Sequence, residues 1–266
     1  SRFKGYEDYV VQDLLVRPYT VRYRRERWVT ADGRHVVAPL PAGIAGHFGP
    51  ELRRFVLAQY HRGQTTVERL VVLLLDLGVD ISKRQVMRLL SAGQEGFIGE
   101  AREVLQTALE TAAWITVDDT GARHKAMNGV CTQIGNDHFA WFATTISKSR
   151  LNFVGLLRAG HGDYVVNQAG LAYMRRRRLS GSALTLLGEH ESKWFADEAA
   201  WTAHLEDLGI PALKGHPDPV MVATEGALWG SVDSHGLLHD TVIVSDDAGQ
   251  FNVGHHALCW VHAERL

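Results

Sequence analysis

The stretch Trp-Ile-Thr-Val-Asp-Asp-Thr-Gly at residues 114–121 passes from a short apolar run directly into carboxylates. The stretch Thr-Val-Ile-Val-Ser-Asp-Asp-Ala-Gly at residues 241–249 repeats that step later in the chain. A short apolar run that is bounded by turn residues is typical of a buried strand. We therefore expect two buried strands that carry Asp118 and Asp246 at their tips.

Two aspartates at strand tips can form a site for divalent metal ions. Hard cations such as Mg²⁺ or Mn²⁺ prefer oxygen ligands. Two such ions side by side can activate a water and stabilise the leaving oxygen of a phosphodiester. The pattern therefore predicts that Asp118 and Asp246 are catalytic residues and metal ligands, with nucleic acid as the substrate. The alternative is a pair of turn residues, because aspartate is common where strands meet loops.

The segments around the first aspartate predict an antiparallel sheet. Strands are expected at residues 113–118, 129–134 and 138–145, joined by tight turns. Ser147 is expected to cap a helix that follows the third strand. Together with a later strand that ends near Asp246, this order predicts an α/β fold in which a three-stranded meander is joined by one parallel strand.

The distance between the two aspartates in the sequence requires an insertion. They are 246 − 118 = 128 residues apart, which is too long for a simple connection between neighbouring strands. We expect a mainly helical insertion over residues 160–235, and a core formed by residues 113–159 and 236–266. Asp163 is a weaker candidate than Asp246, because it precedes the next strand-like run instead of following it.

The first half of the chain predicts a β-ribbon and a helical region. Alternation over residues 17–38 with an Asp-Gly turn predicts the ribbon, and a Pro-rich linker completes an N-terminal region at residues 1–48. Residues 49–112 predict helices, of which two form a helix-turn-helix pattern. The polar residues expected on its second helix to contact DNA are Lys83, Arg84, Gln85 and Arg88. A small helical bundle that binds no DNA is the alternative.

Composition limits the class of protein. The chain has 266 residues, of which 45% are hydrophobic, so it can bury a sizeable core. It lacks both an apolar run long enough to span a membrane and an apolar signal region, so we expect a cytoplasmic protein with no membrane partner. The net charge of −2 gives no global sign of a nucleic-acid partner, so DNA would have to bind local basic surfaces.

Three segments together resemble a known family. They are Val-Asp-Asp-Thr-Gly-Ala-Arg at residues 117–123, Val-Ser-Asp at 244–246 and Cys-Trp-Val-His-Ala-Glu-Arg at 259–265. In order and context they resemble the catalytic region of transposases of the insertion sequence 66 type. The resemblance implies an RNase H-like fold and a DDE active site, with Asp118 and Asp246 as the first two acidic ligands of Mg²⁺ or Mn²⁺. Asp119 stands where the family usually has Glu, at a position not expected to bind metal.

The activity that this resemblance implies is DNA strand cleavage and transfer. The implied partners are the ends of a mobile element and the target DNA, and a homo-oligomer is compatible with this role. Phosphate contacts are expected from Arg123, Lys148 and Arg150, although solvated surface positions are the alternative. A second class of function is a catalytically inactive DNA-binding remnant or regulator of a mobile element.

The resemblance also implies a third acidic residue well downstream of Asp246. Glu264 follows Asp246 by only 18 residues, and the family places its Glu much later. We therefore expect either a fragment of a longer enzyme or a shortened copy. No cysteine precedes Cys131, so the N-terminal zinc module that is often found in such transposases is not expected.

A cluster of His and Cys residues near the end of the sequence suggests zinc as an alternative metal. Its members are His255, His256, Cys259 and His262. On a helix, Cys259 and His262 would fall roughly on one side together with either His255 or His256, and such ligands suit Zn²⁺. Their spacing matches no closed four-ligand pattern, and helix packing explains it equally well.

Overall fold

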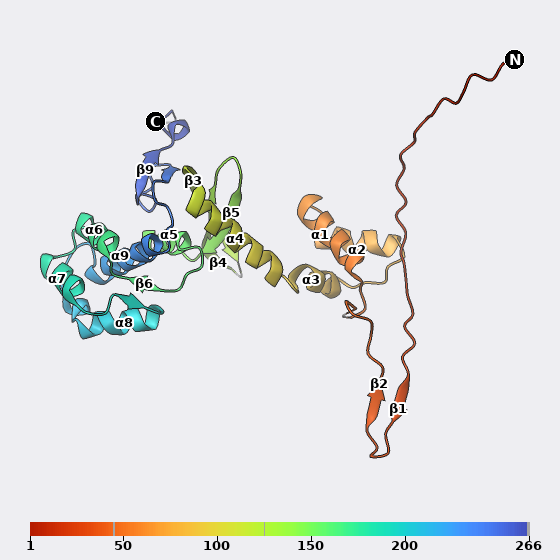
Figure 1. Cartoon of the computed structure of the whole chain (residues 1–266), viewed down its shortest axis with the longest axis horizontal. Helices are drawn as coiled ribbons and strands as arrows, with labels where there is room; N and C mark the ends of the chain where they lie inside the picture. The colour runs from red at the N-terminus through yellow and green to blue at the C-terminus, as the bar shows by residue number, and fades with distance from the viewer. Residues whose placement is uncertain (45, 125, 265–266) are drawn as a thin grey trace. The chain divides into compact units, whose positions relative to one another are not determined.

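The computed structural model of the protein describes residues 1–44, 46–124 and 126–264. The chain forms two compact units, Ser1–Gln94 and Glu95–Leu266 (Figure 1). Each unit has its own cluster of buried apolar side chains. Within the described residues, no helix combines the length and the apolar character needed to cross a membrane.

The first unit begins with an extended segment and a short hairpin. Strands β1 (Arg27–Val29) and β2 (His35–Val37) pair antiparallel, and Gly33 takes the positive φ of +78° that the turn requires. The ribbon is therefore shorter than the predicted residues 17–38. Both strands are exposed along their length, so no buried face extends the pairing.

The helical part of the first unit confirms the predicted helices. It consists of α1 (Pro50–Leu57), a π-helical turn (Ala58–Arg62), α2 (Val67–Asp76) and α3 (Lys83–Ser91). Thr66 caps α2, and Ser82 forms a capping box with Gln85 at the start of α3. The buried side chains that hold these helices together are Val56, Val67, Leu70, Leu74, Ile81 and Val86.

The second unit is built on a mixed sheet of five strands. Its strands are β3 (Trp114–His124), β4 (Met127–Gly135), β5 (Ala140–Thr145), β8 (Val242–Ser245) and β9 (His255–Leu258). Their order is β5-β4-β3-β8-β9. The first three pair antiparallel, whereas β8 runs parallel to β3, and β9 runs parallel to β8. The predicted α/β class and the meander with a parallel strand are confirmed.

Helices α4 (Glu95–Thr111) and α5 (Arg150–Leu157) flank the meander in sequence. Leu105 and Leu109 of α4 belong to the core of the second unit, together with Ile115 of β3. The N-cap of α5 is Ser149 and not the predicted Ser147, because the Ser149 hydroxyl accepts the Asn152 backbone N–H at 3.1 Å.

The insertion between α5 and β8 is mainly helical, as predicted. It contains β6 (Tyr164–Val165), α6 (Gln168–Arg176), α7 (Gly181–Glu189), β7 (Trp194–Phe195), α8 (Glu198–Asp207), a 3₁₀ turn (Ile210–Ala212) and α9 (Pro219–Ser234). β6 and β7 form a separate two-stranded sheet, so the strand-like run before Asn167 does not join the main sheet.

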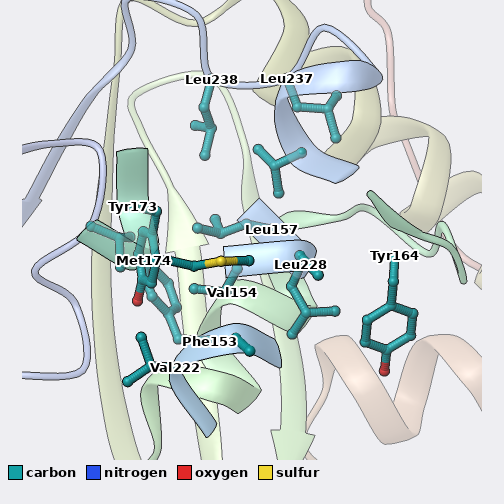
Figure 2. Close-up of a cluster of buried hydrophobic side chains, with 14 of the residues drawn as sticks. Phe153, Val154, Leu157, Tyr164, Tyr173, Met174, Val222, Leu228, Leu237 and Leu238 are labelled. Carbon is teal, nitrogen blue, oxygen red and sulfur yellow. The ribbon is translucent and has the colours of Figure 1, made fainter. Parts of the chain in front are cut away.

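The insertion shares one apolar core with the sheet. Figure 2 shows Val222 and Leu228 of α9 packing among Phe153, Leu157 and Met174, which come from α5 and α6. α9 is buried on most sides and lies beside α5, α6 and β6. The helix therefore connects the inserted segment to the sheet that carries the aspartates.

The end of the described chain differs from the prediction. Residues His255–Leu258 form the parallel edge strand β9 rather than a helix, and a short helix α10 (Trp260–Ala263) follows. Successive residues of a strand point to opposite faces. His255 and His256 therefore do not present the one-sided ligand row that a helix would have given.

Candidate functional site

The two predicted aspartates lie on neighbouring parallel strands. Thr116 of β3 is paired with Val244 of β8, so Asp118 and Asp246 each follow that pair by two residues. Asp246 comes directly after the end of β8, as predicted. Asp118 is not at a strand tip, because β3 continues to His124 in its pairing with β4. The site is therefore placed where β8 ends alongside the middle of β3.

Asp118 and Asp119 point to opposite sides of the sheet. Val117 is buried and Asp118 is exposed, whereas the Asp119 side chain is only 5% exposed. This alternation follows from the two-residue period of a strand. The two neighbouring carboxylates consequently have different surroundings and different partners.

Asp119 has charged and polar side-chain partners. Its Oδ1 forms an ion pair with the ammonium group of Lys148. Its Oδ2 accepts a hydrogen bond of 2.9 Å from the side-chain amide of Gln250. Asp119 thus links β3 to the segment after β5 and to the loop after β8, and its negative charge is locally balanced.

Asp118 and Asp246 accept hydrogen bonds from backbone groups. The Asp119 backbone N–H donates to Oδ1 of Asp118 at 2.8 Å, and the Ala248 backbone N–H donates to Oδ1 of Asp246 at 3.1 Å. Within the described part of the chain, no side chain donates to either carboxylate. Each keeps an oxygen that could bind a cation, which is the donor type that Mg²⁺ and Mn²⁺ prefer.

The ammonium group of Lys148 lies near the carboxylates of Asp118, Asp119 and Asp246. The hydrogen bond and the charge of Asp119 raise the pKa of the Lys148 ammonium group, and the charges of Asp246 and Asp118 add to this effect. Lys148 therefore stays protonated at neutral pH. It can neutralise part of the negative charge of the site or contact an incoming phosphate.

His256 borders the site from the edge strand. Its Nε2 lies 2.7 Å from the Ser245 hydroxyl, next to Asp246 in sequence. Burial lowers the pKa of His256, against the opposing charges of Asp247 and Asp246. The imidazole is therefore neutral at neutral pH. The sequence indicated His256 only as a zinc candidate, and His262 of that cluster has a side chain outside the described set.

The loop after Asp246 is fixed by α5. The guanidinium group of Arg150 donates to the backbone oxygen of Gly249, and the ring of Phe251 packs edge-on against Phe153 with 4.9 Å between centroids. Arg150 was expected to contact phosphate, but the structure gives it this half-buried anchoring contact. Gln250, in the same loop, was not predicted, because its partner Asp119 is 131 residues away in the sequence.

The other residues expected to contact DNA are placed as follows. Arg123 is exposed near the end of β3, and Lys83, Arg84 and Arg88 are exposed on α3. Gln85 is half-buried, and its side-chain oxygen accepts hydrogen bonds from the backbone and hydroxyl of Ser82. Gln85 therefore serves first to cap α3. DNA contact by these residues stays a prediction.

These features define an α/β protein with an acidic site beside two parallel strands. Over 163 residues the chain is 50% identical to the uncharacterized protein y4jO of Sinorhizobium fredii (strain NBRC 101917 / NGR234). The aligned part is 61% of this chain and 50% of that protein, so the chain spans about half the length of this relative. No protein family and no solved structure matches the chain.

Proposed function

We propose that this chain is the catalytic and DNA-binding part of a transposase of the insertion sequence 66 type, with an RNase H-like core. The observation that carries the proposal is that Asp118 in β3 and Asp246 directly after β8 each lie two residues beyond the paired residues Thr116 and Val244 of these parallel strands. An antiparallel meander followed by parallel β8 also agrees with the fold that the sequence resemblance implies.

In this proposal the two carboxylates hold Mg²⁺ or Mn²⁺. Both offer oxygen atoms and accept only backbone hydrogen bonds among the described residues, so they fit hard cations. The bound ions would supply an activated nucleophile and stabilise the leaving oxygen of a phosphodiester. Lys148 would hold a phosphate near the site, while Arg150 would keep the loop that carries Asp246 in place.

The proposal requires a third acidic metal ligand, which neither β3 nor β8 provides. Glu264 follows α10 and is exposed. The resemblance implies a ligand farther along, and the relative is about twice as long as the matched segment. Strand transfer by the whole protein is therefore proposed separately from metal binding by this chain.

Metal binding tests the first step. The measurement is Mn²⁺ titration of the chain, followed by electron paramagnetic resonance of the free ion. We expect Asp118→Asn and Asp246→Asn each to weaken Mn²⁺ binding by at least about tenfold, because each removes a charged oxygen ligand. Asp137→Asn, in an exposed turn before β5, is the matched control and should change nothing. Equal Mn²⁺ binding by all four proteins would contradict the proposal.

A DNA-binding remnant or regulator is the second candidate function. It is favoured by the exposed basic side chains of α3, which could contact DNA. It is also favoured by the ion pair between Lys148 and Asp119, because the charge of Asp119 is balanced without a metal ion. This alternative predicts DNA binding that does not depend on Mn²⁺ and is unchanged in Asp118→Asn. A nuclease assay with Mn²⁺ separates the two functions, because only the first gives metal-dependent nicking.

A further inference from the structure

A second cluster of potential metal ligands lies within the insertion, where the segment after α5 meets the end of α9. It consists of His161 after α5, Asp163 before β6, and His235 at the C-cap of α9. One ligand atom from each residue lies within 4.8 Å of the other two. Among the described residues, no other three His, Cys, Asp or Glu side chains meet this closely.

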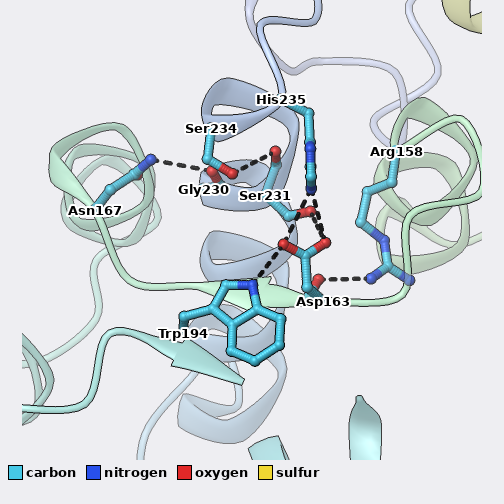
Figure 3. A network of polar contacts seen from close by, with 8 residues as sticks. All are labelled: Arg158, Asp163, Asn167, Trp194, Gly230, Ser231, Ser234 and His235. Atoms are coloured by element: carbon cyan, nitrogen blue, oxygen red, sulfur yellow. Dashed lines mark hydrogen bonds and ion pairs between the residues drawn. The ribbon is translucent and has the colours of Figure 1, made fainter. Parts of the chain in front are cut away.

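The carboxylate of this cluster is held in a fixed direction. The Ser231 hydroxyl donates to Oδ1 of Asp163 at 2.9 Å, and the Trp194 indole N–H donates to Oδ2 at 3.0 Å (Figure 3). Arg158 donates to the backbone oxygen of Asp163 at 2.8 Å, not to its carboxylate. Hydrogen bonds that orient a ligand in this way are typical of metal sites, although a purely structural network would also use them.

Both imidazoles lie close to the carboxylate. Nε2 of His235 lies 3.1 Å from both oxygens of Asp163, midway between them. The ring of His161 stacks on that of His235, with 3.5 Å between centroids and 11° between planes. The backbone N–H of His161 donates to the backbone oxygen of Arg158, but its imidazole ring has no hydrogen-bond partner among the described residues. A cation could bridge this open imidazole, the second imidazole and the carboxylate.

The type of ligand atom selects the type of metal. Two imidazole nitrogens and one carboxylate oxygen suit Zn²⁺ and similar transition-metal ions, whereas the aspartates beside β8 offer only oxygen. Ligand atoms around a tetrahedral Zn²⁺ ion are about 3.4 Å apart, so ligand atoms that now lie up to 4.8 Å apart would have to approach one another by up to about 1.4 Å. The His235 side chain is 30% exposed, which leaves room for its ring to move and for a water as the fourth ligand.

We propose that His161, Asp163 and His235 form a binding site for a Zn²⁺-type ion. Such an ion would tie together the segment after α5, the start of β6 and the end of α9. The chain continues from His235 through buried Leu237 and Leu238 toward β8, which carries Asp246 at its end. The ion would thus join the start of the insertion to its end, next to the segment that leads into β8.

Cobalt tests this proposal because Co²⁺ substitutes for Zn²⁺ and absorbs visible light. The full chain is freed of metal with a chelator and titrated with Co²⁺, and the absorption band and the affinity are recorded. We expect one ion per chain to give rise to the visible band, which should be typical of nitrogen and oxygen ligands without a thiolate charge-transfer band. His161→Gln and His235→Gln should each weaken the binding of this ion by at least about tenfold. His138→Gln, in an exposed turn, is the matched control and should bind like the parent chain.

Three outcomes would overturn the proposal. The first is no Co²⁺ or Zn²⁺ binding by the folded chain at about 100 µM, a concentration at which three-ligand sites are normally occupied. The second is binding that survives both substitutions. The third is binding that His256→Gln abolishes, which would place the ion at β9. If His235→Gln does not fold, His161→Gln alone tests the site, because the His161 ring donates no hydrogen bond to the described residues.

Failure of the Co²⁺ experiment leaves the Mn²⁺ result at Asp118 and Asp246 unaffected, so the two proposals can fail separately.

Discussion

The carboxyl group of Glu225 in α9 is almost completely buried, at 2% exposure. Two partners from α6 and its C-cap compensate for its loss of water. The Tyr173 hydroxyl donates to it at 2.8 Å, and the Nε of Arg177 lies 3.5 Å away. Burial, together with the charge and hydrogen bond of Glu225, raises the pKa of Tyr173. The phenol therefore remains a donor throughout the physiological pH range.

Removing that donor should destabilise the second unit. Tyr173→Phe leaves a buried carboxylate with one partner fewer, so we expect the free energy of unfolding to fall by about 1–3 kcal/mol. Urea unfolding followed by circular dichroism measures the loss. Tyr164→Phe is the matched control, because Tyr164 is also buried but its hydroxyl has no hydrogen-bond partner among the described residues. An equal loss in both variants would show that the Tyr173 hydroxyl contributes nothing specific.

Lys148 should compete with a cation for the acidic site. Its raised pKa means that its positive charge is lost only when the pH rises above the ordinary range of lysine, so it repels Mn²⁺ equally at pH 6 and pH 8. We expect Lys148→Gln to strengthen Mn²⁺ binding at low ionic strength by less than about tenfold, because the group is exposed and screened by salt. Calorimetric titration at two salt concentrations measures this effect. Lys214→Gln, at an exposed position, is the control, and weaker binding by Lys148→Gln would contradict the repulsion.

At the scale of elements, α9 packs closely against β6 at Gly230. A Cβ atom added at Gly230 would lie 2.0 Å from the backbone oxygen of Val165 and 3.0 Å from Oδ1 of Asn167. The side-chain amide of Asn167 donates to the backbone oxygen of Gly230 at 3.0 Å, and its Oδ1 caps α6. The position of α9 against the insertion therefore requires the absence of a side chain.

Gly230→Ala should consequently force α9 away from β6. We expect a loss of about 1–3 kcal/mol in the free energy of unfolding, as is usual when extra atoms enter a packed core. Gly155→Ala in α5 is the matched control, since an added Cβ meets nothing within 4 Å there and alanine favours a helix. In both thermal and urea unfolding, Gly230→Ala should lower the stability and Gly155→Ala should raise it. A Gly230→Ala protein as stable as the parent would mean that α9 has more freedom than the close approach implies.

The elements that could be predicted from the sequence are those that local patterns determine. β3, β4 and β5 follow from apolar alternation between turns, and α2 and α3 follow from their capping residues. β9 could not be predicted, because its four residues form a strand only by pairing with β8. α9 was also not defined, because it is buried around most of its circumference and shows no amphipathic face.

The same distinction applies to the candidate site. Asp118 and Asp246 could be singled out as candidates from the sequence because each follows an apolar run. The contacts of Lys148 and Gln250 with Asp119 were not predicted, because these residues come from segments that only the folded sheet brings together. The cluster of His161, Asp163 and His235 was missed for the same reason, since 72 residues separate the aspartate from His235.

At the scale of the whole molecule, the two units differ strongly in charge. Ser1–Gln94 contains 15 Lys and Arg against 9 Asp and Glu, a net charge of +6, so the rest of the chain carries −8 and the total is −2. The small total therefore hides a basic unit and an acidic unit. A basic unit attracts the phosphates of DNA. An acidic unit attracts divalent cations, and it repels DNA until bound cations neutralise its charge.

This division predicts how DNA affinity depends on salt. Arg84 and Arg88 are exposed on α3 without an ion-pair partner among the described residues, whereas Lys83 is paired with Glu68. If α3 contacts the DNA backbone, each arginine that is replaced by alanine should lower the slope of log affinity against log salt by about 1 and weaken binding at low salt. Fluorescence anisotropy with a labelled duplex measures both quantities.

Arg34→Ala serves as the control, because Arg34 is exposed in the β1–β2 hairpin but already bound to Asp32. An unchanged slope in both α3 variants, with DNA still bound, would assign the contact to another basic segment of Ser1–Gln94 such as residues 22–27. Loss of binding only on addition of a chelator would instead assign it to the acidic unit, where metal ions must first neutralise the aspartates.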